Sequence, residues 1–173
     1  MEIIISEHAK SHMLCHNDEF FKGWYETFEQ IKAQGFLENL SKPSEVISIA
    51  LDEKVGYCNL VDTTDEDEIV YAKRLERELY TRFVKGRTSI ETNNVLIVLR
   101  KSEIKEDAYD FITMYPGFPS EKEPEDRSIA SKEELERSLK FWSSRALIYN
   151  EAVIESGTEK TYCPYQNLYY VFE

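Results

Sequence analysis

Two stretches of the sequence, NVLIVLR at residues 94–100 and YDFITMY at residues 109–115, decide the fold class of this chain. Both are rich in β-branched and aromatic side chains, which favour the pleated surface of a sheet. Residues 68–72 and 78–84 have the same character, and turn-type residues separate the four stretches. Because parallel neighbours need longer crossovers, these short connections predict an antiparallel meander.

The sequence before these strands has the apolar period of helices. Residues 7–15 predict one helix, and residues 18–34 predict a second, with Asp18 as its N-cap and Gly35 as its stop. The apolar stripe of the second helix consists of Phe20, Phe21, Trp24, Phe28 and Ile31. A third helix is expected to begin at Ser44 and to end before Gly56.

The C-terminal part contains another helix signal. Ser131 and Glu134 form the pattern of a capping box, which predicts a helix through residue 142, and residues 145–149 fit a closing strand. Residues 162–172 are rich in aromatic side chains and are expected to pack as an edge strand or an ordered arm. For residues 73–79 the pattern fits a helix as well as a strand, and both alternatives stay open.

Helices followed by strands indicate the α+β class. We expect one domain over residues 1–173, with N-terminal helices followed by an antiparallel sheet of about four to five strands and a late helix packed on it. The helical part is expected at about 7–55, the sheet part at about 68–150 and an aromatic C-terminal arm at about 160–173.

The composition is that of a globular protein, with 42% hydrophobic and 31% charged residues. The longest apolar runs are strand-sized and too short for a membrane helix. The first residues lack the basic start of a secretion signal, and the three cysteines are not in CxxC spacing, as expected of reduced thiols. These features predict a cytoplasmic protein that does not contact the membrane.

The net charge of −12 disfavours binding to a polyanion. Residues 71–101 nevertheless carry eight basic and three acidic side chains, a local net charge of +5. This basic centre fits a local phosphate site, and it fits equally a strand face that is salt-bridged to acidic helices. The charge alone leaves both alternatives open.

The three histidines, His8, His12 and His16, are spaced by four residues and would line one face of a continuous helix. Imidazole titrates near neutral pH, so such a row suits acid–base catalysis. It could also bind a metal, but no further ligand pattern completes a site, and we expect neither a metal nor another cofactor. The remaining alternative is that single histidines are surface or packing residues.

Four short segments, taken in order, resemble nucleases of the barnase/EndoU/colicin/RelE-like superfamily, which includes toxin-associated and phage-borne members. The segments are HMLCH at residues 12–16, KPSEVI at 42–47, ITMYPG at 112–117 and FWSSRALI at 141–148. The histidine pair is one residue closer than is usual in that superfamily and lacks its arginine. Arg145 stands where many relatives have histidine.

The resemblance implies cleavage of RNA without a metal, in which the 2′-hydroxyl attacks the adjacent phosphate. His12 is the first choice for the base or the acid, followed by His16 and then His8. Arg82 and Arg145 would hold the phosphate, and the hydroxyl of Thr113 would donate to it. The residues expected to bind substrate are His8, Lys73, Arg77 and Tyr115.

A second hypothesis is a non-catalytic acidic protein of the immunity or inhibitor type, whose acidic face covers a basic partner. The net charge favours it. Convergence of His12, Arg82, Thr113 and Arg145 in one positive cleft would favour the endoribonuclease, and one continuous acidic face would favour the binding protein. A structural or small-molecule-binding role is the third alternative.

Overall fold

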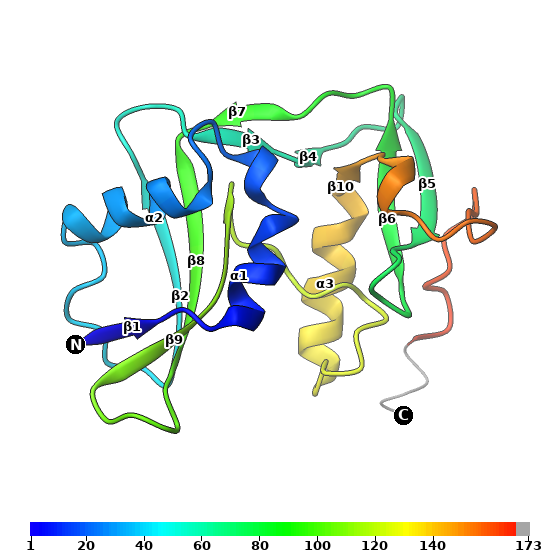
Figure 1. Cartoon of the computed structure of the whole chain (residues 1–173). Helices are drawn as coiled ribbons and strands as arrows, with labels where there is room; N and C mark the ends of the chain where they lie inside the picture. Colours follow the sequence, from blue (N-terminus) through cyan, green and yellow to red (C-terminus); the bar gives the residue numbers. More distant parts are fainter. Residues whose placement is uncertain (169–173) are drawn as a thin grey trace. The chain divides into compact units, whose positions relative to one another are not determined.

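The computed structural model describes residues 1–168 and confirms the α+β class (Figure 1). The last part of the expected aromatic arm, residues 169–173, lies outside the described residues. The chain forms two compact units, each built from two segments: unit 1 comprises Met1–Cys58 and Ile90–Pro119, and unit 2 comprises Asn59–Ser89 and Ser120–Glu173. Neither unit coincides with the expected helical part or sheet part.

Unit 1 contains a four-stranded sheet in the order β1-β9-β8-β2. Its strands are β1 (Glu2–Ile4), β2 (Ser44–Ala50), β8 (Asn94–Lys101) and β9 (Ala108–Pro116). The β8–β9 and β2–β8 pairs are antiparallel, and β1 runs parallel to β9. A separate antiparallel pair joins β3 (Gly56–Cys58) to β7 (Ile90–Thr92).

The helices of unit 1 are α1 (Glu7–Leu14) and α2 (Trp24–Ala33), with the 3-10 turn η1 (Asn17–Glu19) between them. The expected second helix therefore begins later than Asp18, which lies in η1. Gly23 adopts a left-handed φ of 79° before α2, a conformation that interrupts a helix. The side chain of Asn17 accepts a hydrogen bond from Trp24 N at 3.3 Å at the start of α2.

The core of unit 1 joins these helices to the sheet. The rings of Trp24 and Phe28 lie 5.6 Å and 5.4 Å from that of Phe111 on β9, and the second pair is edge-to-face. Phe28 and Ile31 are almost fully buried, whereas Phe21 of the expected stripe is 46% exposed. Burying an aromatic or aliphatic side chain of this size contributes about 1.5–3 kcal/mol, so this contact anchors α2 to the sheet.

The third expected helix is wrong, because residues 44–50 form strand β2. Its side chains alternate in exposure, with Ile49 buried toward the core and Val46 58% exposed. Val46, Ile47 and Ile49 are β-branched and suit a strand. The partner that completes the ladder is β8, about fifty residues later, which no local pattern around Ser44 indicates.

Unit 2 contains a second four-stranded sheet in the order β4-β10-β6-β5. Its strands are β4 (Leu60–Asp62), β5 (Glu68–Lys73), β6 (Tyr80–Lys85) and β10 (Arg145–Ile148). Helix α3 (Lys132–Ser144) leads directly into β10, and the short turn η2 (Glu151–Val153) follows it. Strand β10 pairs antiparallel with β4 and parallel with β6.

Several expectations for this part of the chain are confirmed. Strands form at both expected places between residues 68 and 85, and no helix forms at residues 73–79. Ser131 caps α3 by accepting a hydrogen bond from Glu134 N at 3.1 Å, while the Glu134 carboxylate accepts from Ala130 N. These two backbone contacts fix the start of α3.

The expected single meander is wrong. The β5–β6 hairpin belongs to the sheet of unit 2, and the β8–β9 hairpin belongs to the sheet of unit 1. Each hairpin acquires its outer neighbours from distant segments, β10 in one case and β2 in the other. Local spacing identifies hairpins but carries no information about these long-range partners.

Gly56 allows a close approach between backbone segments of unit 1. A β-carbon at this position would lie 2.1 Å from the carbonyl oxygen of Glu19 and 2.8 Å from the ring of Pro116. The same glycine forms a bridge to Phe20. Only a residue without a side chain lets β3 hold η1 and the end of β9 at this distance.

We expect Gly56→Ala to lower the free energy of unfolding by at least about 3 kcal/mol, because a backbone carbonyl cannot yield. Gly86→Ala is the comparison variant: Gly86 has open space around it and a φ of +71°, so alanine there adds only backbone strain, roughly 1 kcal/mol. Urea unfolding of both variants measures the difference. Equal losses of unfolding free energy in the two variants would show that the close approach at Gly56 does not contribute to stability.

A buried ion cluster organises unit 2. The Glu123 side chain is 3% exposed, and both of its oxygens accept from Arg74 Nη2 at 2.9 Å. Arg77 Nη1 donates to it at 3.0 Å, and the Thr81 hydroxyl also bonds to it. Burial lowers the pKa of Arg74, against the favourable effect of Glu123. The carboxylate therefore joins the turn after β5 to strand β6 and to the loop before α3.

Replacing Glu123 by alanine should lower the unfolding free energy by about 3–5 kcal/mol, because it leaves a largely desolvated guanidinium group without its counter-ion. Glu136→Ala, at an exposed position of α3, is the matched control and should change stability by less than about 0.5 kcal/mol. Denaturant midpoints of the two variants test this. Similar midpoints would contradict the structural role of the cluster.

Candidate active site

Helix α1 places His12 against the sheet of unit 1. The Ser6 side chain caps the helix by accepting from Ala9 N at 3.1 Å, which fixes where the helical period begins. Ala9 and Met13 are buried in the core and set the rotation of the helix. His12, beside Met13, is thereby directed to strand β9.

His12 Nε2 lies 3.2 Å from the hydroxyl oxygen of Thr113 on β9, at hydrogen-bond distance. Which of the two groups donates depends on the tautomer of the imidazole. The Thr113 oxygen also lies 3.8 Å from the sulfur of Met13. The structure thus brings together two residues that are about a hundred positions apart in the sequence, and both were expected at the site.

An irregularity in the β8–β9 ladder lies immediately before Thr113. Thr113 pairs with Val98, but Leu99 pairs with Phe111, so Ile112 has no partner. The core-facing positions of β9 change from odd, at Phe111, to even, at Met114. Bulges of this kind redirect side chains, and this one places Thr113 where the strand changes its inward face.

His16 follows the end of α1 and bonds to a carboxylate. Its Nδ1 lies 3.0 Å from Glu19 Oε2, and the two side chains are 27% and 24% exposed. The His12 and His16 rings lie edge to face, with centroids 5.1 Å apart. The site therefore contains two neighbouring imidazoles, one beside a hydroxyl group and the other beside a carboxylate.

Glu19 is the residue of this cluster that the sequence analysis missed. The spacing from His16 to Glu19 is the three-residue spacing that brings side chains together on a helical turn, and it was the available signal. Because the chain has 33 acidic residues, this spacing did not distinguish Glu19 from the others. The carbonyl of Glu19 also faces Gly56, so the residue is held at both its backbone and its side chain.

The other expected residues of unit 1 contribute differently. His8 lies on the exposed surface of α1, and Tyr115 is partly buried on β9, two residues beyond Thr113. Within residues 1–168, no three side chains of His, Cys, Asp or Glu converge as metal ligands, and no helix is long and apolar enough to cross a membrane.

Arg82 and Arg145, expected to bind phosphate, belong to unit 2. Arg82 is 9% exposed, and its Nη1 donates to the hydroxyl of Thr63 at 2.8 Å and to the carbonyl of Arg145 at 3.0 Å. Arg145 Nε lies 3.3 Å from a carboxylate oxygen of Asp62, and its guanidinium lies 4.6 Å from the centre of the Phe141 ring. Arg82 is thus bonded in the interior of unit 2, whereas Arg145 pairs with an exposed carboxylate at its surface.

Lys73 and Arg77, expected to bind substrate, also lie in unit 2. The Lys73 ammonium is 5.5 Å from the centre of the Tyr80 ring, and Arg77 bonds to the buried Glu123. The basic centre of the sequence therefore supplies internal cation contacts. The expected alternative for residues 71–101, a strand face salt-bridged to acidic helices, differs from this, because Glu123 lies in a loop.

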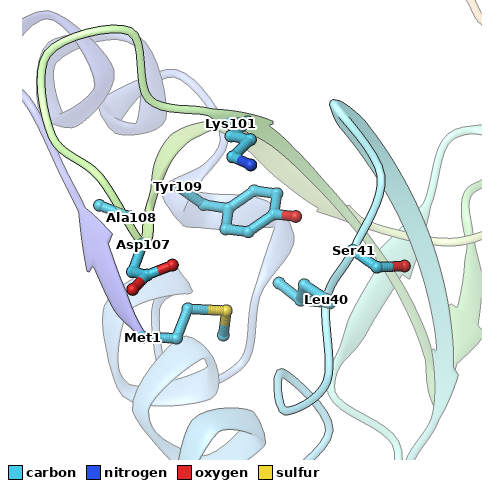
Figure 2. Close-up of a pocket in the computed structure, with 7 residues that line it drawn as sticks. All are labelled: Met1, Leu40, Ser41, Lys101, Asp107, Ala108 and Tyr109. Atoms are coloured by element: carbon cyan, nitrogen blue, oxygen red, sulfur yellow. The ribbon is translucent and has the colours of Figure 1, made fainter.

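Hollows of the described surface include two in unit 1. One, of about 420 Å³, lies between α1 and the start of α2 and is lined by Glu7, Lys10, Ser11, Leu14, Trp24 and Tyr25. The other, of about 290 Å³, contains Tyr109 at its centre and has Lys101 and Asp107 at its sides (Figure 2). The Tyr109 hydroxyl donates to the carbonyl of Lys42 at 2.9 Å, so this ring is fixed by the fold. Neither hollow is lined by the histidines.

Comparison with known proteins identifies a structure with a similar fold but no matching family. No family model matches the chain, and no protein with a curated description matches it. The crystal structure of a conserved hypothetical protein from Toxoplasma gondii ME49 is similar, with a TM-score of 0.55, over 80% of this chain and 92% of that chain. The sequences are 10% identical, so the similarity shows a shared fold alone, and the nuclease resemblance stays a prediction.

Proposed function

We propose that unit 1 carries a metal-independent endoribonuclease site formed by His12 and His16, with Glu19 and Thr113 as positioning residues. The observation that supports it most is the pair of edge-to-face imidazoles, 5.1 Å apart, each with a different hydrogen-bonding partner. A coupled acid–base reaction requires two adjacent groups that can each give or take a proton, and imidazole is a side chain suited to that role.

The reaction consists of one displacement at phosphorus. One imidazole takes the proton of the RNA 2′-hydroxyl, and the 2′-oxygen forms a bond to the adjacent phosphorus. The bond from phosphorus to the 5′-oxygen of the next nucleotide breaks, and the other imidazole gives that oxygen a proton. The products are a 2′,3′-cyclic phosphate and a 5′-hydroxyl. No metal or redox partner enters the balance.

The partners of the two rings determine which nitrogens exchange protons. When Glu19 accepts a hydrogen bond from His16 Nδ1, Nε2 is left as the nitrogen that faces substrate. The contact with Thr113 fixes the orientation of His12. Arg82 and Arg145 are outside this proposal, because their guanidinium groups bond within unit 2. We propose, from the resemblance to toxin-associated and phage-borne nucleases, that such a ribonuclease acts as an effector in the cytoplasm.

The purified chain should cut single-stranded RNA in EDTA and leave 2′,3′-cyclic phosphate ends. His12→Ala and His16→Ala should each slow cleavage by at least about a hundredfold, the usual scale of general acid–base catalysis. Ser11→Ala, at an exposed position of the same helix, is the control for helix integrity and should keep the full rate. Denaturing gel analysis of a labelled oligonucleotide measures both. RNA left intact by ample folded protein would refute the proposal.

Two conservative variants separate positioning from folding. Glu19→Gln keeps the shape of the side chain but removes its charge, and Thr113→Val keeps the volume but removes the hydroxyl. Each should lower kcat by roughly tenfold to a hundredfold with little change in KM, since an ill-oriented imidazole affects the chemical step more than binding. Unchanged kcat in both variants, with unchanged unfolding midpoints, would exclude these residues from the mechanism.

A second candidate, a non-catalytic acidic protein that covers a basic partner, is favoured by a separate observation. The cations expected to meet phosphate are engaged inside unit 2, while the whole chain has a net charge of −12. A protein of this kind would bind a cationic surface with an association rate that falls steeply with salt. Absence of cleavage together with salt-sensitive binding to a lysine-rich polypeptide would select this candidate.

A further inference from the structure

Strand β2 presents an open edge of the unit 1 sheet. It is the last strand in the order β1-β9-β8-β2, and its only strand partner within residues 1–168 is β8. The hydrogen bonds Lys101 N to Pro43 O and Leu51 N to Asn93 O show that the odd-numbered residues face β8. Because bonded pairs alternate along antiparallel strands, the backbone groups of Ser44, Val46, Ser48 and Ala50 point to the open side.

The other edge strands of the two four-stranded sheets are either covered or short. In unit 2, the edge of β5 is covered by the segment after η2: Tyr71 and Lys160 exchange two backbone hydrogen bonds of 2.8 Å and 2.7 Å, and Glu155 N donates to the carbonyl of Lys73 at 2.8 Å. Edge strands β1 and β4 have three residues each. Covering and shortening are the usual protections of an edge, and β2, with seven residues, has neither.

The residues whose backbone groups point to the open side also lack protecting side chains. Ser44, Val46, Ser48 and Ala50 are all exposed, small and uncharged. The one charged residue of the strand, Glu45, is turned back, because its carboxylate accepts from the backbone N–H groups of Ser41 and Lys42. These bonds hold the pKa of Glu45 below its usual value. Lysine or proline, the usual blocks to strand addition, are absent from Ser44–Ala50.

The sequence around β2 is complementary to itself in the antiparallel direction. When a second β2 is aligned with Ile47 opposite Ile47, Ser44 faces Ala50 and Val46 faces Ser48, so every open backbone group finds a partner. In this register Lys42 of one copy lies opposite Asp52 of the other. Both Ile47 side chains, partly buried in the single chain, lie beside each other on the inner face.

Neighbouring registers are less favourable. Alignment of Ser48 opposite Ser48 would place Lys42 opposite Lys54, a repulsive pair. Alignment of Val46 opposite Val46 would leave Ala50 opposite Lys42, beyond the end of the partner's strand. Charge and strand length therefore select the same register, the one centred on Ile47.

We propose that β2 pairs antiparallel with β2 of a second copy of this chain, about a two-fold axis at Ile47, and joins two four-stranded sheets into one. The interaction is isologous, so each Lys42–Asp52 pair occurs twice. A single strand pair has a small area, and the net charge of −12 on each copy opposes association. We therefore expect a weak, concentration-dependent dimer.

Sedimentation velocity across a concentration series tests the dimer directly. The chain should change from monomer to dimer as its concentration rises toward about 100 µM, the range of small interfaces. Ser48→Pro removes an amide that faces the open side, where proline is tolerated in an edge strand, and should abolish the dimer. Ser48→Ala, which keeps the amide, should retain it. A wild-type chain that stays monomeric throughout would overturn the proposal.

A charge exchange tests the register. Lys42→Glu and Asp52→Lys should each weaken dimerisation by roughly tenfold, because two attractive pairs become repulsive. The double variant should restore the wild-type dissociation constant. The two residues lie beyond opposite ends of the same strand, so contacts within one chain cannot produce this rescue. Weakening by both single variants without rescue in the double variant would refute the Ile47-centred register, and RNA cleavage should be unchanged in all three.

Discussion

The pairing of β8 with β9 is the constraint on which unit 1 depends. Strand β8 lies inside the sheet, with Val95, Ile97 and Leu99 almost fully buried, and it provides the ladder for β2 on one side and β9 on the other. The bulge in this pairing lies next to Thr113 and sets which face of β9 meets α1. Core packing, the edge strand and the contact to His12 all follow from that single ladder.

The histidine cluster shows how local and distant constraints combine. The cap at Ser6 and the buried face of α1 set the direction of His12, and the turn after the helix brings Glu19 to His16. These are short-range effects. The hydroxyl that meets His12 comes from β9 and needs the completed sheet. The cluster is held by packing and hydrogen bonds, so its geometry is sensitive to substitutions in the core.

Several cationic side chains of unit 2 bond to acceptors of the same unit. Arg74 and Arg77 bond to the buried carboxylate of Glu123, and the chain after η2 covers the β5 edge of the sheet. Unit 1 contains the partly buried imidazoles of His12 and His16 and the open edge of β2. The functional and the assembly proposals therefore both concern unit 1.

The sequence alone predicted the class of the fold, the strands of both hairpins, the helix near residue 7 and the capped helix after Ser131, because periodicity and capping are local properties. It also put forward His12, His16 and Thr113 as candidate site residues from their chemistry. Tertiary structure decided that residues 44–50 form a strand, that the hairpins belong to different sheets and that the hydroxyl of Thr113 meets His12. These features depend on partners far along the chain. The arginines are a further example. Their number is known from the sequence, but their hydrogen-bonding partners are not. Those partners are carboxylates and carbonyls that only the folded backbone brings to them.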